Sequence, residues 1–211
     1  MIDKSVEHRD IVMVMDGCTT AAMPEPFLPE GFRFRFFNGE EDAAHWCRIE
    51  ASVQEFDSEA DAKKHFEDEF GSHMDQLKER CIFVVNNENH PVATAMGWFS
   101  EDRLTNRLHW IAVCPEYQGL GLGKAVSQKA VTVCAGLSPD HERITWLSTQ
   151  TGSHRAVAIY HKLGFNMTNK LIQSYEEKSY IKDFDRALEV LTAVIRSDVM
   201  ESIKNKAVTD V

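Results

Sequence analysis

The stretch of the chain with the strongest chemical signal carries three alternating glycines, Gly119, Gly121 and Gly123, between a predicted strand and a predicted helix. Glycine has no Cβ, so its backbone can approach a ligand closely and adopt positive φ. Several free N–H groups would then point into one concavity at a helix N-terminus, where the helix dipole favours negative charge. The pattern predicts a binding site for phosphate or pyrophosphate.

Two common classes of phosphate-binding loop fit this stretch poorly. A P-loop needs a first glycine and a final serine or threonine, but Gln118 and Ala125 stand at those positions. A dinucleotide-binding fingerprint needs its third glycine one residue later, so a nucleotide-binding α/β protein is the less favoured interpretation. A glycine-rich turn without a ligand explains one glycine, but not three with Gln118 placed three residues before Gly121.

The motif Gln118-x-x-Gly121-x-Gly123, after a strand that ends in Ile-Ala-Val-x-Pro, resembles the acetyl-CoA signature of the GNAT N-acetyltransferases. Residues 155–165 are similar to the later helix and following strand of that family. Two motifs in the proper order and at the proper separation make a specific resemblance, which covers roughly residues 31–180, about one domain's length. It implies acetyl-CoA as co-substrate, no metal, and direct transfer of the acetyl group to a primary amine of a small molecule or peptide.

The resemblance also implies which residues hold acetyl-CoA. The strand before the loop would run along the pantetheine arm, and the loop would cradle the pyrophosphate. A serine stands where the family often has asparagine before the later helix, and it can cap that helix and still donate one hydrogen bond. The implied cofactor-binding residues are Ile111, Ala112, Val113, Gln118, Gly119, Leu120, Gly121, Leu122, Gly123, Lys124 and Ser153.

Tyr160 is the implied proton donor. It would stand near the thioester sulfur and protonate the leaving thiolate, for which a phenol pKa of about 10 is suitable. On spacing alone, a core aromatic on an amphipathic helix is the simpler interpretation of Tyr160, and the family motif reverses that preference.

His109 is the best candidate for the base that deprotonates the amine. It lies two residues before Ile111, so the period of a strand puts both side chains on one face, and its ordinary pKa of about 6.5 suits the task. The arylalkylamine acetyltransferases of the family similarly carry a histidine at this position and another two residues earlier, where this chain has Arg107. A strand histidine satisfied by a neighbouring group explains His109 equally well.

Acidic residues dominate segment 55–79, whose nine acids and three bases contribute −6 to the chain's net charge of −10. Glu55 and Asp57 lie between the first two predicted helices, where the family builds its acceptor site, and they could hold a cationic amine. A solvated, acidic start of a helix explains either residue singly. The overall excess of acids argues against nucleic acid or an anionic membrane as a partner.

Apolar alternation and helical spacing predict the elements that must position these residues. The resemblance implies an α/β (α+β) fold with a mixed, mostly antiparallel central sheet flanked by helices. The predicted strands are 11–15, 31–37, 81–85, 92–99, 108–113, 144–148 and 165–171. The predicted helices begin near 38 and 58 and cover 121–137, 154–163 and the tail from 175.

We expect three segments along the chain. Residues 1–30, which hold three prolines and no helical period, would form an N-terminal arm. The acetyltransferase domain would span 31–180. A C-terminal helix over 181–211 would pack on that domain or serve in a subunit contact, as in a homodimer.

Two features of the sequence indicate a cytoplasmic location. Its N-terminal apolar run of five residues is short of the about 20 that a membrane span needs and of the about 7–15 in a signal peptide core. The five cysteines form no Cys-x-x-Cys pair, which favours thiols in a reducing compartment. We expect a cytoplasmic N-acetyltransferase, the alternative being a non-catalytic CoA-binding regulatory module on the same fold.

Overall fold

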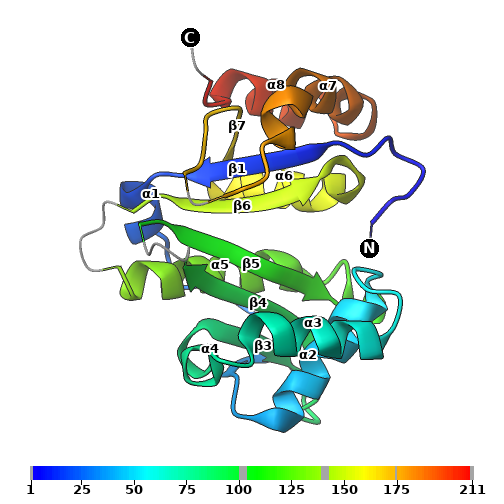
Figure 1. Cartoon of the computed structure of the whole chain (residues 1–211), viewed down its shortest axis with the longest axis vertical. Coiled ribbons are helices and arrows are strands. Elements are labelled where there is room, and N and C mark those ends of the chain that lie inside the picture. Colours follow the sequence, from blue (N-terminus) through cyan, green and yellow to red (C-terminus); the bar gives the residue numbers. More distant parts are fainter. Residues whose placement is uncertain (1, 100–103, 139–142, 174, 210–211) are drawn as a thin grey trace.

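The computed structural model is built around one seven-stranded sheet (Figure 1). It describes residues 2–99, 104–138, 143–173 and 175–209. The strands are β1 (Asp10–Met15), β2 (Arg33–Phe36), β3 (Cys81–Val85), β4 (Pro91–Phe99), β5 (Asn106–Val113), β6 (Thr145–Gln150) and β7 (Asn166–Thr168). Their order is β2-β3-β4-β5-β6-β1-β7, and among these strands only β5 and β6 run parallel. The sheet is therefore mixed and mostly antiparallel, as predicted.

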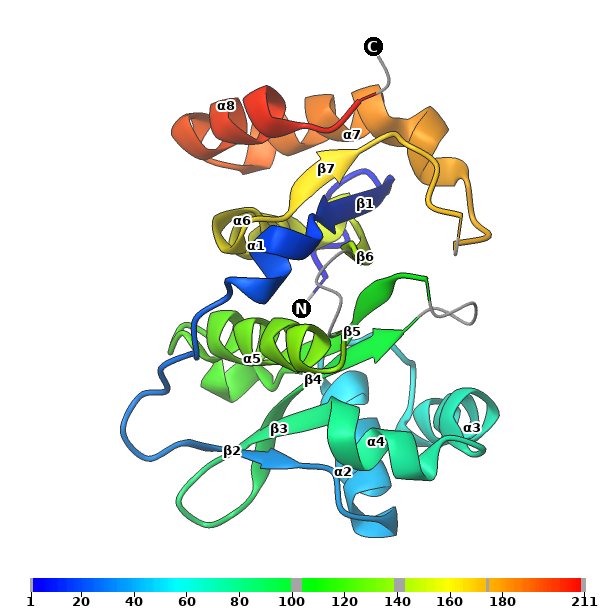
Figure 2. The ribbon, with the colours of Figure 1, turned by 90° about the vertical axis from the view of Figure 1, so that its left-hand side faces the viewer.

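Helices cover both faces of the sheet. They are α1 (Gly17–Ala21), α2 (Glu40–Ser52), α3 (Glu59–Phe70), α4 (Met74–Arg80), α5 (Leu122–Gly136), α6 (His154–Leu163), α7 (Ser179–Val194) and α8 (Ser197–Lys206). Figure 2 shows α5 and α6 on one side of the sheet and α3 and α4 on the other. The helices α7 and α8 lie at the end of the sheet that β7 forms.

The strand β3 shows how this arrangement follows from the sequence. Ile82 and Val84 belong to the core shared with α5 and α6, whereas Cys81, Phe83 and Val85 belong to the core beneath α2 and α3. All five side chains are buried. A continuous apolar run is typical of a strand that is covered on both faces.

The predicted strand at 11–15 forms, as β1 over Asp10–Met15, but it lies in the interior of the sheet and not in an arm outside it. β1 pairs antiparallel with β6 on one side and with β7 on the other. Met13 faces the core that includes α5 and α6, and Val12 faces a smaller core with Trp146 and Tyr180. An apolar side chain on each face suits β1 to the interior of the sheet. The predicted loop after it contains the short helix α1, whose N-cap Asp16 accepts a hydrogen bond from the backbone N–H of Thr19 at 2.8 Å.

Two helices that the spacing predicts as continuous are interrupted. The apolar period through Phe70 and Met74 predicts one helix, but α3 ends at Phe70 and α4 begins at Met74. The C-terminal tail divides into α7 and α8 because Ile195 and Arg196 have extended ψ angles of 141° and 140°. The first of these helices, α7, packs against β1.

The sheet opens between β5 and β6. These strands pair only at Asn106↔Thr145 and Arg107↔Trp146, and then they separate (Figure 1). A bulge interrupts the register of β5 with β4, and at this bulge Trp110 has a φ of 48°. A bulge bends the strand that carries it. The bend in β5 therefore accounts for the opening.

Candidate active site

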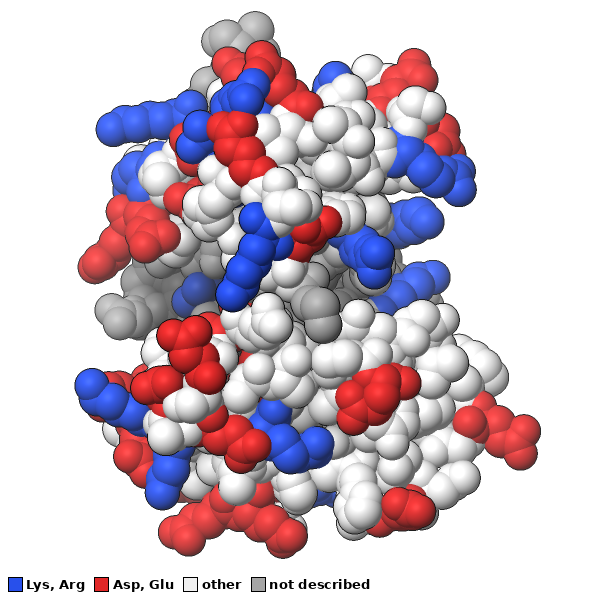
Figure 3. Space-filling view, turned by 90° about the vertical axis from the view of Figure 1, so that its right-hand side faces the viewer, with Lys and Arg blue, Asp and Glu red and all other residues white. Residues whose placement is uncertain are grey.

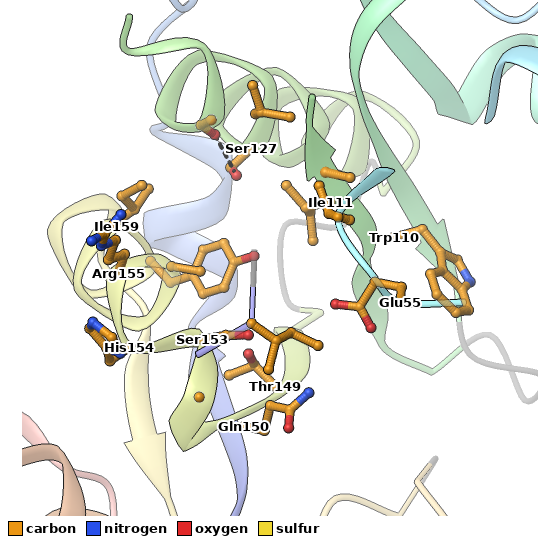
Figure 4. A pocket seen from close by; sticks show the side chains of 18 of the residues that line it. Glu55, Trp110, Ile111, Ser127, Thr149, Gln150, Ser153, His154, Arg155 and Ile159 are labelled. Atoms are coloured by element: carbon orange, nitrogen blue, oxygen red, sulfur yellow. Dashed lines mark hydrogen bonds between the residues drawn. The ribbon is translucent and has the colours of Figure 1, made fainter. Parts of the chain in front are cut away.

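A cavity of about 1070 Å³ lies where β5 and β6 separate. Residues of both faces of the sheet form its wall. Ile111 and Ile159 come from the face of α5 and α6, whereas His109 and Trp110 come from the face of α2 and α3. Figure 4 shows Ile111 turned toward the middle of the cavity and Trp110 turned away from Ile111. The opening in the sheet thus connects its two faces.

The glycine loop forms the wall on the α5 side. Gly119 and Gly121 have φ angles of 81° and 83°, and a Cβ at either position would meet nothing within 4 Å. Glycine is therefore required by the backbone conformation and not by crowding. Gly121 is the N-cap of α5 and supplies no side-chain cap, which leaves amides of the first turn of α5 available to an anion. Gln118 braces the loop, since its Nε2 donates to the carbonyl oxygen of Val113 at 3.0 Å.

Tyr160 projects from α6 into the same cavity wall and is only 6 % exposed. Burial raises the pKa of its phenol, and the carboxyls of Glu55 and Glu50 raise that pKa further. The hydroxyl therefore keeps its proton at neutral pH and can donate a hydrogen bond or a proton.

Glu55 reaches the cavity from the loop after α2. Figure 4 shows its carboxylate turned into the cavity. The loop is anchored by the next residue, Phe56, whose ring stacks on Trp110 with 5.4 Å between the ring centroids. The side chain of Glu55 is exposed to solvent as a whole, and the partial burial of its carboxyl raises its pKa. Asp57 is exposed and lies outside the cavity wall, so the structure separates the two predicted acceptor residues.

Glu50, on α2, is a member of the cavity wall that sequence reasoning missed. Its side chain is fully buried, and neither carboxyl oxygen has a hydrogen-bond partner among the described residues. Burial raises the pKa of Glu50 well above its usual range, and Glu55 adds to this effect. One signal was present: Glu50 lies within the helical stripe of Trp46, Ile49 and Val53, where an apolar residue is expected.

The sequence model described as the Acetyltransferase (GNAT) family matches residues 42–165, more than half of the chain. The chain belongs to the GNAT acetyltransferase family. The matched segment includes most of α2, the opened strands β5 and β6, the glycine loop and Tyr160.

Comparisons with individual proteins agree with this family. The chain is 26 % identical over 159 residues to the mycothiol acetyltransferase of Beutenbergia cavernae, a match that covers 74 % of this chain and 52 % of that protein. The solved GCN5-related N-acetyltransferase of Sphaerobacter thermophilus matches this structure with a TM-score of 0.57 at 20 % identity. The match covers 77 % of this chain and 49 % of that protein. The GNAT acetyltransferase of Colwellia psychrerythraea has a TM-score of 0.56 at 11 % identity, with coverages of 79 % and 55 %. The chain spans about half the length of these relatives, and the structural likenesses show the fold.

Most of the residues predicted to hold the cofactor of this GNAT domain line the cavity. Those that do are Ile111, Ala112, Val113, Gln118, Gly119, Gly121, Gly123, Lys124 and Ser153. Leu120 is exposed instead, and Leu122 is buried in the core. Ser153 occupies the N-cap position of α6 but makes no capping hydrogen bond. Its side chain therefore does not act as the predicted cap.

Charge differs between the two sides of this GNAT site. The cavity wall on the α5 and α6 side includes the cations Lys124, Arg155 and Lys162, which favour a polyanion. Figure 3 shows basic side chains at mid-height on its right and acidic side chains gathered over the lower left. A globally acidic chain thus presents a local positive field near its glycine loop.

His109 does not share a face with Ile111, because the bulge at Trp110 shifts the alternation of β5 by one residue. Its Nε2 lies 2.7 Å from Oε1 of Glu69, and Trp110 Nε1 donates to Oε2 of the same carboxylate at 2.9 Å. Burial lowers the pKa of His109 to about 4, with Arg107 acting in the same direction and Glu69 opposing it. The imidazole is therefore neutral. Since an ionised carboxylate only accepts hydrogen bonds, Nε2 carries the proton of the ring.

Two further side chains that could be mistaken for catalytic groups lie apart from the cavity wall. Cys114 is buried in the core beneath α2 and α3, and burial raises the pKa of its thiol. Glu116 is exposed in the short helical turn Pro115–Tyr117. Among the described residues, no cluster of histidine, cysteine or acidic side chains could hold a metal ion, and no helix has the length and apolar character needed to cross a membrane.

Proposed function

We propose that this GNAT acetyltransferase moves an acetyl group from acetyl-CoA directly to a primary amine of a small molecule or peptide. The observation that carries the proposal is the alignment, along one cavity, of a glycine loop at the start of α5, the phenol of Tyr160 and the carboxyls of Glu50 and Glu55. Acetyl-CoA would supply the acetyl group as an activated thioester.

The residues present fit this co-substrate. Beyond Arg107, β5 makes no ladder pairs with β6 in the described structure. Apart from the Val113 carbonyl, which Gln118 occupies, backbone groups on the inner edge of β5 from Ile111 to Val113 are therefore available to a pantetheine arm. The amides at the start of α5, together with Lys124, suit a pyrophosphate.

The acceptor amine must lose a proton, since an ammonium group cannot attack a carbonyl. Glu50 and Glu55 are two acidic groups in one cavity wall. Burial and the charge of Glu55 raise the pKa of the Glu50 carboxyl, which favours a pair in which the buried Glu50 keeps its proton and the exposed Glu55 is the carboxylate. Such a pair carries one negative charge, attracts a cationic amine and can accept one more proton from it. We infer that this pair takes the proton.

His109 is the weaker candidate for the base. Its Nε2 is engaged by Glu69, and a neutral imidazole with a pKa of about 4 binds a proton poorly. The charges that shift the pKa of Tyr160 are those of Glu55 and Glu50. The phenol that would protonate the leaving thiolate therefore lies within electrostatic reach of the carboxyl pair.

An assay of CoA thiol release with a panel of amines tests the proposal, with thermal shift on CoA as a measure of binding. We expect Tyr160→Phe and Glu55→Gln each to lower kcat by about 100-fold while CoA affinity stays within about 2-fold of the unmodified protein. Asp57→Asn, two residues from Glu55 but outside the cavity wall, is the matched control and should leave the rate unchanged.

Two results would oppose this function, and a third would change only the assignment of the base. A protein that does not bind CoA contradicts the site. CoA binding without turnover on any amine would favour a regulatory CoA-binding module. A rate that depends on His109 and not on Glu55, shown by a flattened pH profile in His109→Gln alone, would return the role of base to the histidine.

A further inference from the structure

A guanidinium on the acceptor side of the cavity has no part in the reaction proposed above. Arg107 lines the cavity and lies at the last β5–β6 pair, opposite Trp146. Its Cζ is 4.8 Å from the centroid of the Trp146 ring and 6.0 Å from that of Tyr175. The two aromatic rings hold the guanidinium at the point where the strands begin to separate.

The positive charge of Arg107 lacks a close counter-ion. It forms no ion pair with any described carboxylate, its Nε is buried without a hydrogen-bond partner, and its Nη2 makes one long contact of 3.5 Å with Ser148 Oγ. Burial lowers the pKa of this group, yet a guanidinium does not lose its proton in proteins. Arg107 is half-buried at the cavity wall. A charge that is partly removed from water without a partner is costly, so the site favours an anion.

The acids nearest in electrostatic effect are already engaged. Glu69 accepts hydrogen bonds from His109, Trp110 and His65. Glu177 accepts one from the hydroxyl of Tyr175 at 2.9 Å. Neither carboxylate forms an ion pair with the guanidinium in the part of the chain that the structure describes.

The anion that Arg107 would meet is not the pyrophosphate of the co-substrate. Val113, the last residue of β5, lies six positions after Arg107, which is about 20 Å along a strand, and the glycine loop lies beyond that end. Trp146 and Tyr175 lie in the core on the side of the sheet that is remote from α5. The guanidinium therefore faces the space left for the acceptor.

We propose that the acceptor carries a carboxylate in addition to its amine, and that Arg107 binds this carboxylate while Glu55 and Glu50 receive the amine. A planar guanidinium matches the two oxygens of a carboxylate with parallel hydrogen bonds. The acceptor class is then an amino acid or a compound with the same pair of groups. This inference rests on the proposed function and specifies the substrate class of the same site.

Matched pairs of amino acids and their decarboxylated amines test the inference: tyrosine with tyramine, tryptophan with tryptamine, and ornithine with putrescine. For at least one pair we expect the amino acid to have a kcat/KM on the order of 100-fold higher than the amine in the unmodified protein. In Arg107→Gln that preference should collapse through a rise in KM for the amino acid, while kcat/KM for the amine changes little. Arg107→Lys should retain part of the preference, since it keeps the charge but not the bidentate geometry.

Arg33→Gln is the matched control, because Arg33 is exposed on β2, bonded to Asn89 and absent from the cavity wall. Its kinetics should equal those of the unmodified protein. A binding measurement removes the dependence on turnover: 3-phenylpropionate and 3-(4-hydroxyphenyl)propionate, which lack the amine, should raise the thermal midpoint of the unmodified protein and of Arg33→Gln but not of Arg107→Gln.

Two outcomes overturn the inference while leaving the proposed function intact. One is acetylation in which every decarboxylated amine equals or exceeds its amino acid. The other is an Arg107→Gln protein that loses the same factor on both members of a pair. Absence of acetylation on every amine defeats the proposed function, and the carboxylate-dependent thermal shift then still decides whether Arg107 binds an anion.

Discussion

Replacing Glu50 with methionine should make the protein more stable and less active. The carboxyl is fully buried with no partner for either oxygen among the described residues, and leaving such a group unsatisfied costs about 1–3 kcal/mol. Methionine has a similar length and no polar oxygens, so Glu50→Met should recover about that free energy of unfolding.

The gain should depend on pH, and the sign follows from proton linkage. The pKa of Glu50 is about 4.5 when unfolded and is raised in the native state by burial. As pH rises above 4.5, the unfolded chain gives up this proton while the native protein keeps it, so each pH unit in that window lowers native stability by up to about 1.4 kcal/mol. Glu50→Met removes this term. Its advantage over the unmodified protein should therefore grow from pH 5 to pH 7.5.

Urea unfolding at the two pH values measures this effect, and thiol release measures activity. Glu67→Gln, at an exposed position on α3, is the control and should stay within about 0.5 kcal/mol of the unmodified protein at both pH values. The reasoning is refuted if Glu50→Met is less stable than the unmodified protein at pH 7.5, or if the stability difference is the same at both pH values. Undiminished acetyl transfer in Glu50→Met would refute the role of Glu50 in proton transfer.

Three further predictions follow from local geometry. Gly121→Val should weaken CoA binding by about 10-fold or more and destabilise the protein by about 1–2 kcal/mol, because φ at this position is 83°. Calorimetry measures the CoA affinity and urea unfolding measures the stability. Gly136→Ala, at a position without positive φ, is the control. Glu69→Gln should cost about 2–3 kcal/mol at pH 7. Burial raises the pKa of Glu69, but hydrogen bonds from His109, Trp110 and His65, with the charge that His109 gains in acid, outweigh burial and lower this pKa to about 2. This contribution to stability is present above pH 4.5 and is lost as pH falls toward 2. The free energies of unfolding of Glu69→Gln and of the unmodified protein should therefore become equal in acid. Ser58→Ala should cost about 1 kcal/mol in urea unfolding, since Ser58 Oγ caps α3 by accepting from the N–H of Asp61 at 3.1 Å.

Local features of the site were readable from the sequence. The conformation of the glycine loop and of the helix after it is set by residues close together in the sequence. The alternating glycines permit positive φ at 119 and 121, and the apolar stripe that follows them defines α5. The same holds for α6, which ends at Gly164 with a φ of 109° as the sequence predicts. Tyr160 was found through the family motif, since its spacing within α6 by itself favours a core aromatic.

Features set by distant pairing were not readable. The apolar run at 11–15 predicts a strand but does not identify its partners, which lie at least 130 residues away. The bulge in β5 is centred on Trp110, a residue with no preference for positive φ, so nothing local warned that His109 would change face. Glu50 could have been selected, since a carboxylate within an apolar helical stripe is unusual, but its place in the cavity depends on how α2 packs on the sheet.

The interior position of β1 has a consequence for how the protein is made. Synthesis proceeds from the N-terminus, so β1 emerges long before Gln150, the residue that pairs with Asp10 at a separation of 140 residues. Until β6 and β7 are complete, both edges of an apolar strand lack their partners, and unpaired strand edges promote association between chains. Deleting residues 1–15 would likewise not trim an appendage but would remove a middle strand and expose new edges on β6 and β7. We therefore expect the shortened chain to express at a lower yield than the full chain, whatever its activity.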